Sequence, residues 1–306
     1  MTEELYKVHR PKSFNQVVGQ DAAIKTLSKL GQSGKMPHAL LFTGASGVGK
    51  TTIARILKDK LNCSDADYVE KNASEQRGID TIREIKSKMV LSPLMGKVKV
   101  YVIDECQSLT SEAQEAFLKI LEDTPKHVYF MLCTTDPQKL KKTIITRCTE
   151  IKLTALSPVD VRKLVGNVAE AESLKLSTDV VDAIVDACDG SARKALVLLN
   201  SVMSLTEEND QLEAIQNSSV KSVAFDIAKT LLASKTFVDV AKVLKTCDED
   251  AEQIRRVVLG YCSTVLLGGG AKAGRAFAII DVFRNNFYDS GKAGLVASCY
   301  EVFLEA

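Results

Sequence analysis

The sequence contains no tryptophan, and aromatic residues make up only 6% of its 306 residues. So few aromatic side chains argue against a β-sandwich and against a sugar-binding cleft built from aromatic rings. The sequence also has no large excess of charge of either sign, because it contains 40 Lys and Arg and 39 Asp and Glu. A protein that coats nucleic acid with one broad face is usually strongly basic. Any contact with DNA is therefore expected to be local.

Long apolar runs and close cysteine pairs are lacking as well. Residues 1–6 contain no apolar segment typical of a secretory signal, and the apolar run 98–103 is too short to span a bilayer. We therefore expect a cytoplasmic protein with no membrane partner. The eight cysteines stand singly without a CxxC pair, which favours small buried or inert thiols over structural zinc.

Apolar strands alternate with amphipathic helices in the first half of the chain. Strands are predicted at 39–43, 68–71, 98–103, 128–133 and 151–153, and helices at 51–61, 78–90 and 111–122. This alternation indicates an α/β fold in which helices cover both faces of a parallel sheet. After residue 155 the strand signal stops, and helices are predicted at 159–170, 179–188 and 192–203.

The remaining sequence is predicted to be helical. Ser157 and Pro158 suit the N-cap and first position of a helix. Residues 206–219 are polar and are predicted to form a linker or turn. Helices follow from 220 to 306, with breaks at Gly268–Gly270 and Gly291. We predict three domains, at 1–155 (α/β), 156–215 (small and helical) and 216–306 (helical).

Residues 44–51 match the phosphate-binding loop pattern at every required position. Its glycines let backbone N–H groups turn toward phosphate oxygens, and the following helix adds the partial positive charge of its N-terminus. Lys50 is expected to reach the β- and γ-phosphates, and Thr51 to coordinate Mg²⁺. The residues expected to bind ATP here are Gly44, Ala45, Ser46, Gly47, Val48, Gly49, Lys50, Thr51 and Thr52.

Two adjacent carboxylates, Asp104 and Glu105, follow the predicted strand 98–103. Alone, such a pair is often only a solvated strand end. About 50 residues beyond a phosphate loop, however, it completes one site. Asp104 is then expected to act on Mg²⁺, and Glu105 to orient and polarise the attacking water.

Three further positions carry weaker signals. Thr134 and Thr135 end the predicted strand 128–133 and either lie near the γ-phosphate or simply terminate the strand. Arg147 follows a basic stretch and could bind phosphate with its planar guanidinium, although its sequence context alone favours an ordinary surface residue. Arg193 is predicted in the first turn of a helix, where a cation opposes the helix dipole, which hints at a role elsewhere.

In their order these motifs resemble those of AAA+ clamp-loader ATPase subunits, such as the bacterial gamma/tau subunit and the small subunits of replication factor C. The resemblance covers about residues 5–200 and is carried by segments 9–20, 37–51, 72–83, 96–105, 116–125, 133–140, 146–148 and 190–196. It implies an AAA+ ATPase domain, a lid domain and a collar domain. It also implies an enzyme that uses ATP and Mg²⁺ to load a sliding clamp onto primer–template DNA in replication.

The resemblance also assigns roles to single residues. Thr135 corresponds to the sensor of the γ-phosphate, Arg193 to a lid arginine on ATP of the same chain, and Arg147 to an arginine finger on a neighbour's ATP. Val17 and Val18 correspond to contacts with adenine. The residues implied to follow DNA are Arg77, Gly78 and Arg83, and the apolar candidates near the clamp are Leu91, Leu94 and Met95. The implied partners are other loader subunits in a pentameric ring, the clamp and primer–template DNA.

Several positions depart from the family. Cys63 stands where the gamma/tau zinc module would begin, but the module is missing, so no zinc is expected. Thr146 replaces a serine, His9 replaces a tyrosine, and Cys106-Gln107 after the acidic pair is unusual. The chain also lacks the long extension of tau. These absences fit a compact viral version, which would act in the host cytoplasm.

Two alternatives remain beside the clamp loader. Another AAA+ DNA enzyme, such as a branch-migration motor or recombination factor, would share the phosphate loop, but segments 146–148 and 190–196 favour the loader. A non-hydrolysing scaffold subunit usually has a damaged phosphate loop. Here Gly49, Lys50, Thr51, Asp104 and Glu105 are all present, which favours an active enzyme.

Overall fold

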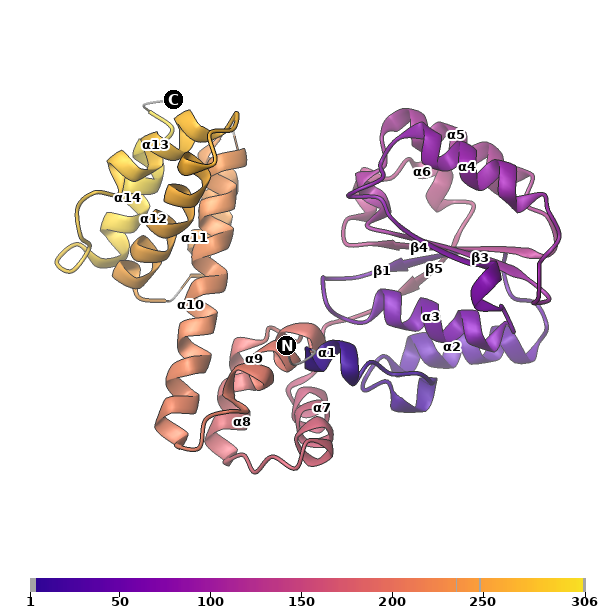
Figure 1. The fold of residues 1–306 in the computed structure, drawn as a ribbon, viewed down its shortest axis with the longest axis horizontal. Helices are drawn as coiled ribbons and strands as arrows, with labels where there is room; N and C mark the ends of the chain where they lie inside the picture. Colours follow the sequence, from indigo (N-terminus) through magenta and orange to yellow (C-terminus); the bar gives the residue numbers. More distant parts are fainter. Residues whose placement is uncertain (1–3, 235, 248, 305–306) are drawn as a thin grey trace. The chain divides into compact units, whose positions relative to one another are not determined.

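The structure is a computed structural model that describes residues 4–234, 236–247 and 249–304, without the side chains of 218–222. The chain divides into two compact units, Met1–Ser204 and Leu205–Ala306 (Figure 1). Residues 1–3 of the predicted first domain, and 235, 248 and 305–306 of the predicted third, lie outside the described residues.

A parallel sheet forms the centre of the first unit. In the described part of the chain it has five strands in the order β2-β3-β4-β1-β5. The strands are β1 (Ala39–Thr43), β2 (Tyr68–Asn72), β3 (Lys99–Asp104), β4 (Val128–Thr134) and β5 (Thr149–Lys152). The α/β parallel architecture predicted from the sequence is confirmed. Because all strands run the same way, the loop after β1 and the acidic pair after β3 meet at one edge of the sheet.

Helices cover both faces of this sheet (Figure 1). One face carries α2 (Asp21–Gln32) and α3 (Lys50–Lys60), and the other carries α4 (Ile79–Met89), α5 (Ser111–Glu122) and α6 (Lys142–Ile145). Successive side chains of β1 alternate between the two layers, with Phe42 in the core shared with α3 and Leu41 in the core shared with α4 and α5. Burying each of these side chains contributes about 1.5–3 kcal/mol, which fixes the register of the central strand.

Short helices and a three-helix group complete the first unit. The 3₁₀ turns are η1 (Phe14–Gln16), η2 (Asp65–Asp67), η3 (Cys106–Ser108) and η4 (Pro137–Lys139). The remaining helices are α1 (Leu5–Val8), α7 (Pro158–Ala171), α8 (Thr178–Ala187) and α9 (Ala192–Val202). Ser157 caps α7 by accepting a hydrogen bond from the Asp160 amide at 3.2 Å, and Pro158 opens the helix, as predicted.

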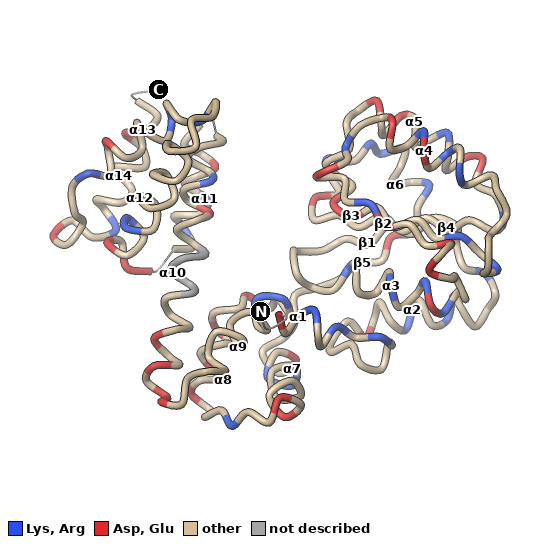
Figure 2. Tube along the Cα trace, in the orientation of Figure 1, with Lys and Arg blue, Asp and Glu red and all other residues tan. Residues whose placement is uncertain are grey.

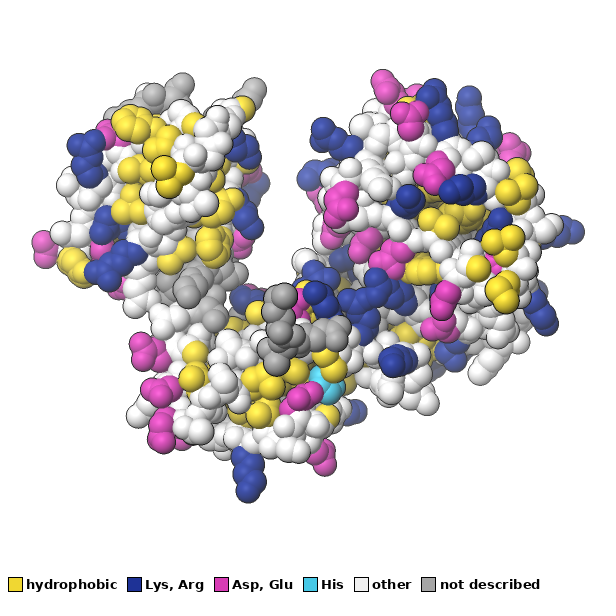
Figure 3. Space-filling model, in the orientation of Figure 1, with side chains coloured by type: hydrophobic (Ala, Val, Ile, Leu, Met, Phe, Trp, Pro, Cys, Tyr) yellow, Lys and Arg dark blue, Asp and Glu magenta, His cyan; other side chains and the backbone are white. Residues whose placement is uncertain are grey.

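The second unit is helical in its described residues. Its helices are α10 (Glu208–Ala233), α11 (Phe237–Lys245), α12 (Ala251–Leu267), α13 (Ala273–Val282) and α14 (Gly291–Glu301). Their core includes Ile227, Leu231, Val258 and Phe283. Hydrophobic side chains also reach the surface of this unit (Figure 3), and Leu267 is 89% exposed.

The predicted linker at 206–219 is wrong, because α10 runs through most of it. The segment is polar enough to resemble a loop. Its helix nevertheless buries Gln211 and Ile215, four residues apart on one face. The Gln211 side-chain amide also donates a hydrogen bond to the Leu205 carbonyl at 2.7 Å, which closes the helix start.

Lys and Arg are interspersed with Asp and Glu over both units (Figure 2), in keeping with a net charge of +1. Of the helices described, none has the length and apolar character needed to cross a membrane. The eight cysteines are free thiols; Cys148 is half-buried and the others are buried. Burial raises the pKa of the Cys148 thiol to about 12, so this thiol stays protonated at neutral pH.

Candidate functional site

The loop after β1 has a backbone that depends on its glycines. Gly44, Gly47 and Gly49 have φ angles of 148°, 75° and 105°, which L side chains rarely adopt. A Cβ on Gly44 would lie 2.5 Å from the Leu153 carbonyl oxygen, and one on Gly47 would lie 2.2 Å from the Ser191 hydroxyl oxygen. Since backbone and side-chain atoms already occupy these places, only glycine lets the loop turn here.

Lys50 is the first residue of α3 and is held inside the loop. Its Nζ donates hydrogen bonds to the carbonyl oxygens of Gly44 at 2.9 Å and Ala45 at 2.8 Å. The residue is only 6% exposed, and this burial lowers the pKa of its ammonium, while the negative charges of Glu105 and Asp104 oppose the shift. The Lys50 ammonium therefore lies beside the backbone N–H groups at the N-terminus of α3, and this combination favours the binding of phosphate.

Thr51 and Asp104 are brought together although they are far apart in the sequence. The Thr51 hydroxyl donates to Asp104 Oδ2 at 2.8 Å, and Asp104 Oδ1 accepts from the Glu105 amide at 3.0 Å. Glu105 has a left-handed backbone with φ of 49°, which turns the chain sharply after β3. A hydroxyl and a carboxylate in contact are hard oxygen donors of the kind that Mg²⁺ prefers.

These groups line one pocket in the first unit. The lining residues include Val17, Val18, Ser46, Gly47, Val48, Gly49, Lys50, Thr51, Thr52, Asp104, Glu105, Arg193 and Leu196. The pocket therefore combines an apolar wall, the N–H-rich loop, a cation and an acidic pair. This residue set fits a magnesium-bound nucleoside triphosphate, because each part of such a ligand meets groups of complementary chemistry.

Arg193 reaches the pocket from α9, where it lies in the first turn as predicted. Its backbone N–H donates to the Gly47 carbonyl at 3.3 Å, so the helix start contacts the loop directly. The guanidinium carbon lies 5.7 Å from the centre of the Tyr6 ring, within the range of a cation–π contact. Tyr6 and Arg193 thereby form one side of the pocket.

Gln20 holds the apolar wall in place. Its side-chain amide donates to the Thr154 carbonyl at 2.7 Å, and its side-chain oxygen accepts from the Thr154 amide at 3.1 Å. Gly19 and Gln20 both have left-handed backbones, which bend the chain out of the wall segment and into α2. The position of Val17 and Val18 is therefore fixed by a buried polar contact as well as by packing.

Thr135 and Arg147 do not line this pocket in the described part of the chain. Thr135 follows β4, and its hydroxyl donates to Glu105 Oε2 at 3.3 Å. Arg147 follows α6 and is 38% exposed; its guanidinium donates to Glu122 Oε1 at 2.5 Å and to the Thr143 carbonyl at 3.1 Å. The structure thus brings Thr135 beside the acidic pair and leaves Arg147 at the surface.

The residues implied to follow DNA lie around the start of α4. Arg77 and Gly78 are exposed just before the helix, and Gly78 is its N-cap. Arg83 is exposed on α4 and forms an ion pair with Asp80 at 2.9 Å. Such an exposed pair is worth little to stability, so Arg83 is available to an anionic partner.

The segment after α4 presents apolar side chains to solvent. Leu94 is 77% exposed and Met95 is 84% exposed, and Leu91 is exposed as well. The buried Asp67 carboxylate accepts from the amides of Leu94 (2.6 Å), Met95 (3.0 Å) and Gly96 (2.8 Å). Burial alone would raise the pKa of Asp67, but these amides and the Ser64 hydroxyl hold it well below its usual range. We call residues 91–96, fixed in this way, the apolar loop.

Some residues at the site were not indicated by the sequence. Tyr6, Gln20, Gln107 and Glu122 are single polar or aromatic residues without a motif of their own. Gln20 closes a segment that resembles the family opening, which is the one signal available for it. The other three gain their contacts only through folding.

Among the residues described, no group of three or more His, Cys, Asp or Glu side chains is placed to hold a metal ion. Cys63 is buried, and its surroundings raise the pKa of its thiol, chiefly through desolvation.

Comparison with known proteins gives matches in both sequence and fold. A family model described as "DNA polymerase III, delta subunit" matches residues 19–76 and 64–157. The chain is 34% identical over 225 residues to DNA polymerase III subunit gamma of Buchnera aphidicola, covering 67% of this chain and 62% of that protein. It is also 34% identical to subunit tau of Bacillus subtilis, covering 67% of this chain and 40% of tau. The chain therefore spans less than two thirds of the length of these relatives.

Solved structures with a similar fold include the RuvB Holliday junction branch migration motor of Thermotoga maritima. The TM-score is 0.57, with 20% sequence identity, 73% of this chain covered and 79% of that chain covered. A likeness at this identity concerns the fold alone. It agrees with a parallel sheet flanked by helices and joined to further helices.

Proposed function

This chain is similar to the DNA polymerase III gamma and tau subunits over two thirds of its length, and from that premise we propose that it is an ATPase subunit of a sliding-clamp loader. In this proposal it acts in the cytoplasm, in a pentameric ring-like assembly with other loader subunits. ATP binding and hydrolysis at sites between subunits open a clamp and load it onto primer–template DNA.

The contact between Thr51 and Asp104 beside the buried Lys50 carries the ATPase proposal. Lys50 and Thr51 begin α3 and Asp104 ends β3, and all three line a pocket that also contains Glu105. When bound, Mg²⁺ would offset charge on phosphate oxygens. Thr51 and Asp104 would hold the ion, Lys50 would bind phosphate, and Glu105 would orient water.

The remaining residues are assigned by their positions. Val17 and Val18 form an apolar wall suited to a base, and Arg193 lies where a lid arginine could contact phosphate. Arg147 lies away from its own pocket and is exposed, which supports a role on a neighbour's nucleotide. Arg77, Gly78 and Arg83 would follow the DNA backbone, which needs basic groups but no reading of sequence.

The apolar loop is the proposed contact with the clamp. Exposed Leu94 and Met95 are costly to leave in water unless a partner covers them, and interfaces are enriched in such side chains. The backbone around them is already ordered by Asp67, so little conformational entropy is lost on binding.

The substitution Lys50→Ala tests the nucleotide site. We expect it to abolish ATP binding, measured with a fluorescent ATP analogue, because the buried cation is lost. Lys25→Ala removes an exposed lysine from α2 and serves as the control, with binding unchanged. Undiminished ATP binding by Lys50→Ala would overturn the proposed role of the loop.

A second measurement tests the process that the chain serves. We expect ATP hydrolysis by the purified assembly to rise when a sliding clamp and primed DNA are added together. Stimulation by a four-way DNA junction instead would favour a branch-migration motor. Absence of hydrolysis despite normal ATP binding would favour a scaffold subunit.

A further inference from the structure

Gln107 occupies a position between the two strand ends that carry Glu105 and Thr135. It lies in η3, two residues after Glu105, and is half-buried. Its side chain extends to the end of β4, where Thr134 and Thr135 follow one another. In the described residues, Glu105 lines the nucleotide pocket but Gln107 and Thr135 do not. The three side chains therefore meet beside the pocket.

Hydrogen bonds define how the Gln107 amide is oriented. Thr134 Oγ1 accepts from the Asp136 amide at 3.0 Å, so its own hydrogen is donated to Gln107 Oε1 at 2.7 Å. Gln107 Nε2 faces the Glu105 carboxylate, which in its ionised form only accepts hydrogen bonds. The Glu105 carboxylate thus assigns the orientation of the amide, because a flipped Gln107 would place its side-chain oxygen against a group that can only accept.

Both hydrogens of the Gln107 amide nitrogen have an acceptor. Nε2 donates to Glu105 Oε2 at 2.5 Å and to Thr135 Oγ1 at 3.0 Å. The Thr135 hydroxyl in turn donates to the same Glu105 Oε2 at 3.3 Å. One oxygen of the Glu105 carboxylate is therefore held by two donors, the Gln107 amide and the Thr135 hydroxyl. A contact to a charged acceptor is among the stronger hydrogen bonds in proteins.

We propose that Gln107 is a positioning residue that restrains Glu105 and makes its release depend on Thr135. This rests on the proposed function, in which Glu105 orients the attacking water and Thr135 senses the γ-phosphate. A threonine hydroxyl has a single hydrogen. If Thr135 donates that hydrogen to a phosphate oxygen, it can no longer donate it to Glu105, and Gln107 alone keeps the carboxylate turned aside.

The restraint predicts that loss of the amide increases turnover in the resting chain. Gln107→Leu keeps the size of the side chain and removes its three hydrogen bonds. We expect kcat for ATP hydrolysis without clamp or DNA to rise about fivefold, with KM for ATP within about twofold of wild type. The stimulation by clamp and primed DNA should shrink by a similar factor, since part of the release has already occurred.

Two further variants separate this role from a general effect on folding. Gln107→Asn keeps an amide that is too short to bridge Glu105 and Thr135, and is expected to behave like Gln107→Leu. Gln138→Leu alters an exposed glutamine near the same strand end, in η4, and should leave kcat unchanged. The thermal unfolding midpoint of each variant shows whether a change in kcat arises without loss of structure.

Steady-state ATP hydrolysis of the full chain decides between the outcomes. A higher resting kcat in both Gln107 variants, with KM preserved, supports the restraint. An unchanged or lower resting kcat overturns it. This failure differs from failure of the proposed function, which would appear as absent ATP binding by the wild-type chain.

Discussion

At the scale of single residues, the pocket is built by contacts between side chains that are distant in the sequence. The Thr51 hydroxyl donates to the Asp104 carboxylate at 2.8 Å, and Glu105 accepts from Thr135, which follows β4. Such contacts have low tolerance for change, because a substitution that removes one donor leaves an acceptor without its partner. Substitutions within this network therefore need a measurement of stability beside the measurement of activity, whereas residues outside it test function more directly.

Arg147 offers such a test, since it lies outside its own pocket. Arg147→Ala should leave ATP binding unchanged and reduce hydrolysis by the assembly on the order of a thousandfold, as expected when an arginine finger is lost. Arg162→Ala, which removes an arginine that is 46% exposed and paired with Asp182, is the matched control. Both variants are compared by single-turnover hydrolysis.

Action on a neighbour's nucleotide predicts complementation. Assemblies containing only Arg147→Ala chains, or only Glu105→Gln chains, should both be inactive. Mixing them creates sites in which an intact Arg147 faces an intact Glu105, so hydrolysis should recover in part. If isolated monomers of the Arg147 variant already lose hydrolysis equally, the residue acts within its own chain.

At the scale of elements, the apolar loop depends on one carboxylate. Asp67→Asn keeps the shape of the side chain but removes its negative charge, and one of its terminal atoms becomes a donor that faces backbone N–H groups. We expect the amides of Leu94, Met95 and Gly96 to exchange hydrogen faster and clamp binding to weaken, with ATP binding unchanged. Hydrogen exchange measures the first effect, and titration with the clamp measures the second.

The neighbouring Asp65 supplies the control for this prediction. Its side chain is 95% exposed and pairs with Lys58, so Asp65→Asn should alter neither exchange nor clamp binding. The Asp67 contacts favour the charged carboxylate and hold its pKa below the ordinary value of 3.8. Their contribution to stability is thus present above that value and is lost as the pH falls below it.

The sequence predicted most elements of the first unit because their patterns are simple. The central strands are apolar on both faces, and α3, α4 and α5 carry regular apolar stripes. The start of α10 was not predicted because the segment is mostly polar, and only Gln211 and Ile215 in it are buried. Parallel topology brings the loop after β1 and the ends of β3 and β4 to one edge of the sheet, which is why Thr51, Asp104 and Thr135 lie near one another.

Other features of the site could not be read from the sequence. Gln107 was noted only as an unusual residue after the acidic pair, and Glu122 has an ordinary local context; the contacts of both form only when the segments ending β4 and α6 come to lie beside them. Gln20 bonds to Thr154 across 134 positions of the chain. Pairings at such separations are set by the tertiary fold, which local propensity does not encode.

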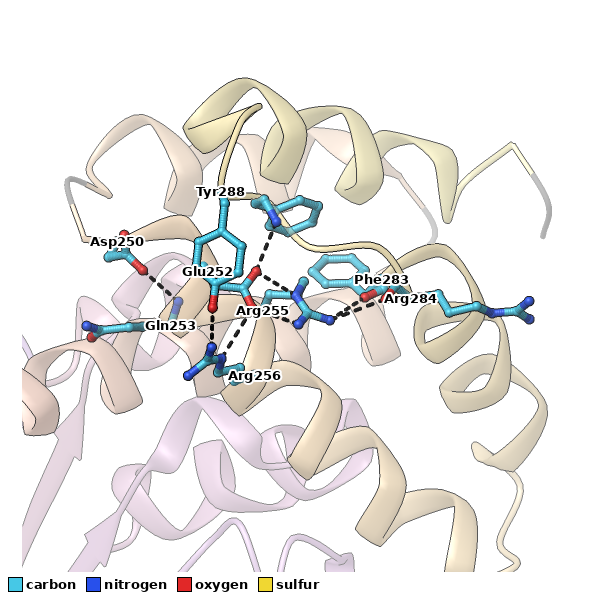
Figure 4. Close-up of polar contacts among 9 residues, drawn as sticks. Asp250, Glu252, Gln253, Arg255, Arg256, Phe283, Arg284 and Tyr288 are labelled. Carbon is cyan, nitrogen blue, oxygen red and sulfur yellow. Dashed lines mark hydrogen bonds and ion pairs between the residues drawn. The ribbon is translucent and has the colours of Figure 1, made fainter.

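At the scale of the whole molecule, the second unit contains a buried charge cluster (Figure 4). The side chain of Glu252 is 5% exposed and accepts from Arg255 at 2.7 and 2.8 Å and from Arg256 at 3.2 Å. It also accepts from the Phe287 amide at 2.9 Å, which ties α12 to the segment before α14. These contacts, led by the bonds from Arg255, lower the pKa of Glu252 to about 2.

Stability of this unit should therefore depend on pH. The Glu252 pKa lies below its ordinary value of 4.5, so its contribution is present above pH 4.5 and is lost as the pH falls toward 2. Glu252→Gln should destabilise the chain by about 2 kcal/mol at pH 7 and much less near pH 2. Urea unfolding at both pH values measures this. Glu213→Gln, on the exposed side of α10, should have no such effect.

The hydrogen bonds from the apolar loop to Asp67 also affect how the sequence of that loop can change between related proteins. Asp67 binds backbone N–H groups, which every residue except proline possesses, so it sets the shape of the loop without regard to most side chains at 94 and 95. Only Gly96 is restricted, because a Cβ there would lie 2.9 Å from the Ser64 nitrogen. Mutations at 94 and 95 can therefore change the choice of partner while the scaffold persists, which leaves recognition free to evolve separately from folding.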